Sequence, residues 1–152
     1  MKRKLLSWIL VMIFSWIPLL HAEDSAAPPT EVQSPFQGEF VYPPGQVIEL
    51  NLLIDGVHWS TFKLDGGDPA DLKPGKTTKV EVVNTLENTA SRTRVLSIVI
   101  LLEDSTGNLL ERLSLGEVKL SKGRYRSDRQ KFKLRNDTLI DLAKIYIFAE
   151  IK

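Results

Sequence analysis

Cysteine is absent from this 152-residue chain, and histidine occurs only twice. The lack of cysteine excludes disulfide bonds, a thiol nucleophile, a cysteine-ligated zinc site and a lipid-modified N-terminal cysteine. Small exported domains often rely on disulfides, so this chain must be held together by its hydrophobic core alone. With 43% hydrophobic residues, the chain is long enough for one domain with such a core.

Recognisable catalytic motifs are missing as well. The sequence contains no Gly-rich phosphate loop, no G-x-S-x-G nucleophile elbow and no pair of carboxylates in a catalytic setting. His21 lies in the N-terminal segment described next, which leaves His58 beside Trp59 in a predicted strand. A surface or half-buried histidine is the expected role there. We therefore expect no enzymatic activity and no cofactor.

The first 22 residues have the layout of a secretory signal peptide. Basic residues 2–4 precede an apolar run over residues 5–17, and the segment ends at the small residue Ala22. The apolar run is shorter than the about 20 residues that a membrane span needs. We expect cleavage after Ala22 and an exported protein, periplasmic or extracellular. An uncleaved membrane anchor is the alternative.

The charge of the cleaved chain is small but unevenly distributed. Cleavage removes three of the 20 basic side chains and leaves 17 against 19 acidic ones, a net charge of −2. A nucleic-acid partner is therefore not expected. Residues 23–91 carry four basic and eleven acidic side chains, net −7, whereas residues 92–152 carry thirteen and eight, net +5. Such an asymmetry often reflects which strands face solvent, and steering of a charged partner is the alternative.

The mature chain divides into a leader and one β-rich domain. Residues 23–38 are polar and contain three prolines, which predicts a disordered leader. From residue 39 to 152 the hydrophobic period is two, and turn-forming residues separate the alternating stretches. These stretches include QVIELNLLI, GVHWSTFKL, TTKVEVVN, RQKFKLR and KIYIFAEI. About seven or eight strands with turn signals between them predict an all-β sandwich.

Three stretches need separate comment. RVLSIVILLE, residues 94–103, is apolar on both faces, which predicts a central strand. LLERLSLGEVKL, residues 109–120, fits either a helical turn or two strand pieces kinked at Gly116, and we favour strands. NDTLIDLAK, residues 136–144, predicts one short helical turn.

The segment LKPGKTTKVEVVNTLENTASRTRVLSIVILLEDSTGNLL, residues 72–110, resembles bacterial immunoglobulin-like domains of the adhesion-related and FxLYD-like kinds. The features shared are a Pro-Gly turn, an alternating strand that ends in Asn, and an apolar strand that ends in Asp and Gly. The matching residues are Pro74, Gly75, Val80, Val82, Asn84, Ile98, Ile100, Asp104 and Gly107. The resemblance implies an immunoglobulin-like antiparallel β-sandwich of about seven to eight strands, with a role in adhesion, assembly or spacing and no active site.

KGRYRSDRQKFKLR, residues 122–135, holds seven basic side chains and one acidic one. From Lys131 on, basic and apolar residues alternate, which predicts a strand with one wet face. Arg124 and Arg126 have the opposite parity, so a bulge at residues 127–128 is expected to turn both basic sets outward. The candidate ligand-binding residues are Arg124, Arg126, Arg129, Lys131, Lys133 and Arg135. The alternative is a solvated face whose lysines protect a sheet edge.

Two further groups of residues are expected to have structural rather than ligand-binding roles. Asp65, Asp68 and Asp71 offer oxygen ligands, but their spacing differs from that of a calcium loop, and the same residue types form ordinary turns. No metal site is expected there. Trp59 and Phe62 differ in strand parity, so a flat strand places them on opposite faces. At least one is then expected in the core, which disfavours a joint platform for stacking on sugars.

These observations favour a non-catalytic binding or assembly module of the periplasm or cell surface. Its expected partner is another protein of the cell envelope, which would pair with residues 145–151 if that strand lies at a sheet edge. The alternative is a secreted binder of acidic polysaccharide or lipid headgroups that uses the basic strand face. Contact with a membrane is otherwise expected only if residues 1–22 remain uncleaved. Asn136 begins a glycosylation acceptor pattern, which matters only in a eukaryotic source.

Overall fold

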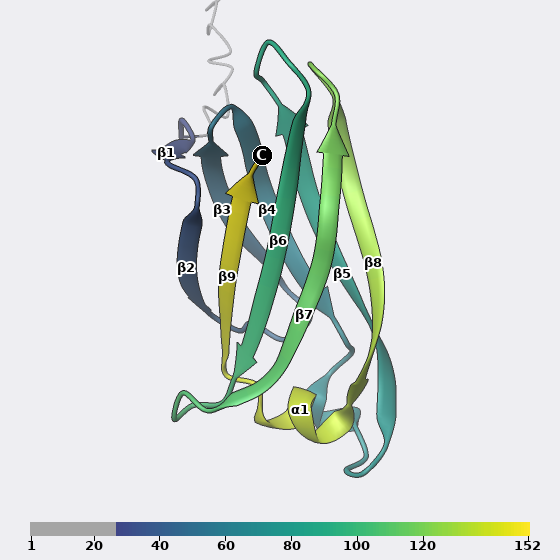
Figure 1. Ribbon diagram of the computed structural model, residues 1–152. Helices are drawn as coiled ribbons and strands as arrows, with labels where there is room; N and C mark the ends of the chain where they lie inside the picture. Colours follow the sequence, from purple (N-terminus) through teal and green to yellow (C-terminus); the bar gives the residue numbers. More distant parts are fainter. Residues whose placement is uncertain (1–26) are drawn as a thin grey trace, which may run out of the picture.

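The computed structural model describes residues 27–152, which form nine strands in two sheets (Figure 1). The five-stranded sheet contains, in spatial order, β1 (Thr30–Val32), β3 (Val47–Ile54), β4 (Val57–Asp65), β5 (Thr77–Asn88) and β8 (Tyr125–Arg135). The four-stranded sheet contains β2 (Phe36–Val41), β9 (Lys144–Ile151), β6 (Arg94–Glu103) and β7 (Leu109–Leu120). The predicted signal peptide lies outside the described residues.

Within the described part of the chain, helical structure is confined to two short elements between strands. These are the 3-10 helix η1 (Pro69–Asp71) and the α-helix α1 (Asn136–Asp141), which confirms the helical turn predicted after residue 135. Among residues 27–152, no helix is both long enough and apolar enough to span a bilayer.

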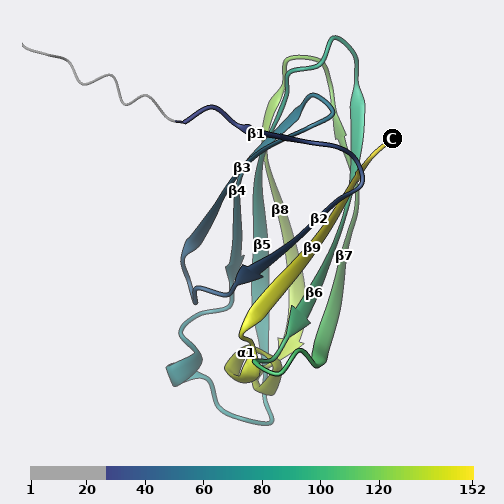
Figure 2. The same cartoon turned by 90° about the vertical axis from the view of Figure 1, so that its left-hand side faces the viewer.

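The two sheets face each other in two layers and enclose the hydrophobic core (Figure 2). Alternate side chains of the strands are buried, as a period of two requires. The largest fully buried side chains are Trp59, Phe62, Ile54, Leu64, Leu86, Leu96, Ile98, Ile100, Leu102, Leu120, Leu139 and Ile145. The prediction of an all-β fold is confirmed, and the two-layer arrangement is compatible with a sandwich.

The central position of the apolar stretch at residues 94–103 is confirmed, because β6 has β9 on one side and β7 on the other. β7 is one strand from Leu109 to Leu120, so the strand interpretation is also confirmed. Its pairing with β6 shifts register between Ile98 and Val99, opposite Gly116, whose φ is 65°. Glycine adopts this left-handed conformation without the steric cost that other residues have.

The predicted disordered leader is wrong from Thr30 onward. β1 pairs with β3, and β2 pairs with β9 over its whole length. Val32, Phe36 and Phe40 pack against the core. These few apolar contacts order the proline-containing segment, although its polar composition predicts disorder.

The purely antiparallel expectation needs one correction, because β1 and β3 are parallel. Parallel neighbours within one sheet need a long crossover connection. Here the chain makes that crossover through β2, which lies in the opposite sheet, so no crossover helix is required.

Trp59 and Phe62 are both fully buried, contrary to the expectation that they face opposite ways. The register between β4 and β5 shifts between Trp59 and Thr61, so Ser60 acts as an extra residue that resets the parity. The two rings meet edge to face, with centroids 6.5 Å apart and planes at 72°. Their predicted role in the core is confirmed.

Asn88 is a fully buried polar side chain that ties the end of β5 to the next turn and to β7. Its amide nitrogen donates to the carbonyl oxygens of Arg92 and Leu120, both at 2.9 Å, and its Oδ1 accepts from the N–H of Ala90 at 3.0 Å. Asn88→Ala is expected to lower the free energy of unfolding by about 1–3 kcal/mol, because buried backbone groups lose their partners. Urea titration followed by circular dichroism measures this loss.

Asn84 provides the matched control for this substitution. It is also fully buried on β5, but within the described residues neither polar atom of its side chain has a hydrogen-bond partner. Asn84→Ala removes the same atoms without breaking hydrogen bonds and should cost less. Equal losses for the two variants would show that the hydrogen bonds of Asn88 contribute nothing.

Candidate functional site

The six predicted ligand-binding residues lie on two different surfaces. β8 pairs with β5 in unbroken register from Tyr125 to Arg135, so the bulge predicted at residues 127–128 is wrong. An unbroken ladder keeps every backbone hydrogen bond, and it leaves Arg126 on the core-facing side of β8 together with Leu134. The outward-facing members are Arg129, Lys131, Lys133 and Arg135, and Arg124 precedes the strand.

Arg126 has a structural role at the margin between the two sheets. Its guanidinium lies 2.8 Å from Asp128, a carboxylate that is only 4% exposed. Gln130 donates from Nε2 to Asp128 at 3.1 Å and to the carbonyl oxygen of Leu115 on β7 at 2.8 Å. Because a buried carboxylate needs such partners, Arg126 has a structural role as the ion-pair partner of Asp128.

The outward-facing cations of β8 meet a lysine of β5. Lys79 lies directly opposite Lys133, and Glu81 lies opposite Lys131. We call the outward-facing set the basic face; it consists of Lys79, Arg129, Lys131, Lys133 and Arg135. β4 lies on the other side of β5 and places Asp65 opposite Glu81.

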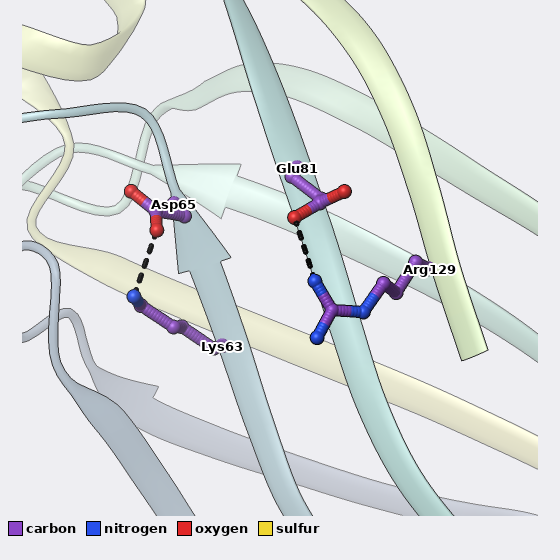
Figure 3. A network of polar contacts seen from close by, with 4 residues as sticks. All are labelled: Lys63, Asp65, Glu81 and Arg129. Atoms are coloured by element: carbon purple, nitrogen blue, oxygen red, sulfur yellow. Dashed lines mark hydrogen bonds and ion pairs between the residues drawn. The ribbon is translucent and has the colours of Figure 1, made fainter. Parts of the chain in front are cut away.

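Two carboxylates beside the basic face already have partners (Figure 3). Lys63 Nζ lies 2.7 Å from Asp65, and Arg129 Nη1 lies 3.4 Å from Glu81. The hydrogen bond from Lys63 lowers the pKa of Asp65, so this carboxylate is ionised at neutral pH.

A third pair lies at the end of the basic face, where β8 meets α1. Arg135 contacts Asp137 at 2.8 Å. The pKa of Asp137 is lowered by the backbone N–H of Gly75 and by Arg135. Both ends of the basic face are therefore internally neutralised, while its centre is not.

Three lysines at this centre, Lys79, Lys131 and Lys133, have no salt bridge to any described residue. An open depression of about 210 Å³ lies beside them, lined by Lys79, Lys131, Asp65, Glu81 and Val80. The arrangement offers ammonium groups to an anion and lacks a nucleophile–base pair.

The outer surface of the four-stranded sheet has a different character. Val99 and Leu101 of β6 lie opposite Phe148 and Tyr146 of β9, and all four side chains are half-buried. The rings of Tyr146 and Phe148 are 5.2 Å apart. A recess of about 340 Å³ is lined by Val99, Leu101, Phe148 and Arg112 of β7. We call Val99, Leu101, Tyr146 and Phe148 the apolar face.

Strand pairing through residues 145–151, the expected mode of partner binding, is not available. β9 lies between β2 and β6, so both of its hydrogen-bonding edges are occupied. The edge strands are β1 and β8 in one sheet and β2 and β7 in the other.

The other candidates from the sequence, the aspartates of residues 65–71 and His58, make contacts that stabilise the fold. Among residues 27–152, no group of three or more potential ligands is placed to hold a metal ion. Asp68 accepts a backbone hydrogen bond at the start of η1, which is a capping role. His58 is half-buried, as expected, with Nε2 3.0 Å from Oδ1 of Asn51.

Asn136, the acceptor in the glycosylation pattern, is buried. Its amide donates to the carbonyl oxygen of Lys73, and its Oδ1 accepts from the hydroxyl of Thr78, both at 2.8 Å. A glycan on this nitrogen is incompatible with these contacts.

Comparisons with known proteins do not assign the chain to a family. No family model matches it, and no curated protein matches it. Among solved structures, the chain is similar to an RGD-containing host-selective toxin, ToxA of Pyrenophora tritici-repentis. The match has a TM-score of 0.32 and 15% sequence identity, and it covers 84% of this chain and 97% of the toxin chain. A similarity of this degree supports no conclusion about function.

Proposed function

We propose that the chain is an exported, non-catalytic binding or assembly module of the periplasm or cell surface, built on an immunoglobulin-like sandwich. The apolar face is the observation that supports this best. An apolar and aromatic cluster on the outside of a sheet contributes nothing to the core between the sheets. Such clusters are typical of protein–protein contact sites.

The surroundings of the apolar face favour a protein as its occupant. Glu39 and Lys144 form a 2.9 Å ion pair on the β2 side, and Arg112 lies on the β7 side. An apolar centre with a polar rim is the usual anatomy of a protein interface, and aromatic and arginine side chains supply most of its binding free energy. We infer another protein of the cell envelope.

The immunoglobulin-like assignment rests on the path of the chain. After β5 the chain passes to the other sheet, forms the β6–β7 hairpin, returns for β8 and passes again for β9. Repeated passage between two packed sheets is typical of Greek-key sandwiches, of which immunoglobulin-like domains are one kind. Such domains present their faces and edges as binding surfaces without a catalytic site.

Phe148→Asp is expected to weaken partner binding at least tenfold, because a buried aromatic at an interface centre contributes about 2 kcal/mol or more. The measurement is photo-crosslinking in the producing cell, with a photoreactive phenylalanine analogue in place of Leu101. A discrete adduct with one envelope protein is expected, and Phe148→Asp should remove it while thermal unfolding by circular dichroism stays cooperative.

Thr85 provides the control position, since it lies on β5 in the opposite sheet and is also half-buried. The analogue at Thr85 should give no such adduct, and Thr85→Asp should leave the Leu101 adduct unchanged. Equal adducts from both positions, or an adduct that survives Phe148→Asp, would refute the apolar face as the binding surface.

A further inference from the structure

The central lysines of the basic face include a pair of like charges on neighbouring strands, which strand pairing normally avoids. Lys79 and Lys133 are directly opposite each other on β5 and β8, and like charges in this position repel. Lys131 is the next outward-facing residue along β8. The nearby carboxylates Asp65 and Glu81 are engaged by other cations (Figure 3). Local conflicts of this kind are expected where a surface has a function.

Protection of the exposed edge of β8 does not explain all three central lysines, Lys79, Lys131 and Lys133. Lysine on an edge strand discourages pairing with another chain, and β8 is an edge strand. Lys79, however, lies on β5, which at this point is paired with β8 and which is paired with β4 only from Glu81 onward. A lysine on β5 does not protect the edge of β8, so its position directly opposite Lys133 needs another reason.

We infer that Lys79, Lys131 and Lys133 form a binding site for a linear acidic polysaccharide, whose carboxylate or sulfate groups contact the three ammonium groups. The site lies on the outer surface of the five-stranded sheet, on the opposite side of the molecule from the apolar face. It is carried by different residues from those of the proposed protein interface, so either can fail without the other.

The geometry of the basic face suits a linear ligand. Successive outward-facing side chains on a strand are about 7 Å apart, so the row from Arg129 to Arg135 extends over about 20 Å. Lys79 widens this row by one strand spacing, about 5 Å. A polymer with repeated anionic groups can contact the whole row, whereas one compact headgroup can contact only part of it.

The neighbours of the three lysines favour a glycan over a membrane or a nucleic acid. The next outward-facing residues along the two strands are Thr77 and Glu81 on β5 and Arg129 and Arg135 on β8. All four are polar, whereas interfacial binding to a lipid surface typically combines basic side chains with apolar ones that insert. Single-stranded nucleic acid is bound with aromatic side chains that stack on bases, and none adjoins these lysines.

The test compares heparin binding by the purified chain and by a Lys79→Gln/Lys131→Gln/Lys133→Gln variant. We expect retention of the unmodified chain on heparin at about 0.15 M salt, weakening as salt rises because charges are screened. The triple variant should bind a soluble heparin fragment at least tenfold more weakly, measured by calorimetry. Its thermal unfolding temperature should be equal or higher, because the repulsion between Lys79 and Lys133 is removed.

A Lys119→Gln/Lys122→Gln/Arg124→Gln variant is the control, since it loses the same charge near the β7–β8 turn. It should bind the heparin fragment like the unmodified chain. Phe148→Asp should also leave heparin binding unchanged, which separates this site from the apolar face.

Three results would overturn the inference. The first is no heparin binding by the unmodified chain, and the second is equal weakening in both triple variants, which would show a nonspecific charge effect. The third is tighter binding, dependent on the same lysines, to phosphatidylglycerol vesicles or to a single-stranded oligonucleotide. Lys79→Gln alone guards against a folding artefact, because it should weaken binding and preserve stability.

Discussion

Trp59→Ala is expected to lower the free energy of unfolding by about 3–5 kcal/mol, which approaches the whole stability of a small domain. Trp59 is fully buried between the sheets and packs edge to face against Phe62. Its removal leaves a cavity that the surrounding strands cannot close, since each is held in a sheet by its own hydrogen bonds. No disulfide limits the unfolded chain. Guanidinium titration followed by circular dichroism measures the loss.

Trp59→Phe separates packing from hydrogen bonding at this position. The indole Nε1 donates to the carbonyl oxygen of Thr61 at 3.0 Å, next to the irregularity at Ser60. Phenylalanine keeps most of the apolar volume and loses this donor, so a smaller cost of about 1–2 kcal/mol is expected. A cost below about 1 kcal/mol for Trp59→Ala is incompatible with a fully buried ring.

The strand around Trp59 also shows which feature of the fold the sequence does not predict, namely a shift in strand register. Alternation predicts the faces of a strand correctly as long as the register is continuous, as it is throughout β8. The irregularity at Gly116 was visible because glycine marks it. Nothing in the residues around Ser60 marks the irregularity between Trp59 and Thr61, because it depends on the pairing of β4 with β5. One extra residue there places Trp59 and Phe62 on the same, core-facing side of β4 instead of on opposite sides.

Part of the basic face was predictable for the same reason. The alternation of cations with Phe132 and Leu134 is local, and it correctly placed Lys131 and Lys133 outward. The opposition of Lys79 and Lys133 was not predictable, because it depends on the register between two strands that are distant in the sequence. The sequence places Arg126 wrongly because it predicts a bulge at residues 127–128, where the structure has an unbroken ladder and Asp128 as that arginine's ion-pair partner.

The apolar face was present in the sequence but was interpreted differently. The stretch at residues 94–103 is apolar on both faces, and this predicted correctly that β6 is central. A central strand in a two-layer protein still has one outward face, which the four-stranded sheet leaves half-buried at Val99 and Leu101. Only the pairing with β9 shows that Tyr146 and Phe148 continue this face. That β1 and β2 form strands instead of a disordered leader likewise depends on pairing with strands distant in the sequence.

Ile100→Ala is expected to lower the free energy of unfolding by about 2–5 kcal/mol. Ile100 is fully buried in the centre of the four-stranded sheet, where it lies opposite Leu113 of β7 and Ile147 of β9. The alanine variant loses the contacts of three carbon atoms and leaves a cavity between two rigid layers. Urea titration with fluorescence of the buried Trp59 reports this loss directly.

Leu101→Ala is the matched control, because Leu101 follows Ile100 on the same strand and faces outward. It also loses three carbon atoms, but from a half-buried site that solvent can fill without a cavity. A cost of about 1 kcal/mol is expected for a side chain that loses only part of its burial. The ratio of the two costs reports which face of β6 is covered by the other sheet. Equal costs, or a larger cost at Leu101, would mean that the outer surface of β6 is also packed, and the apolar face would then be core rather than a binding surface.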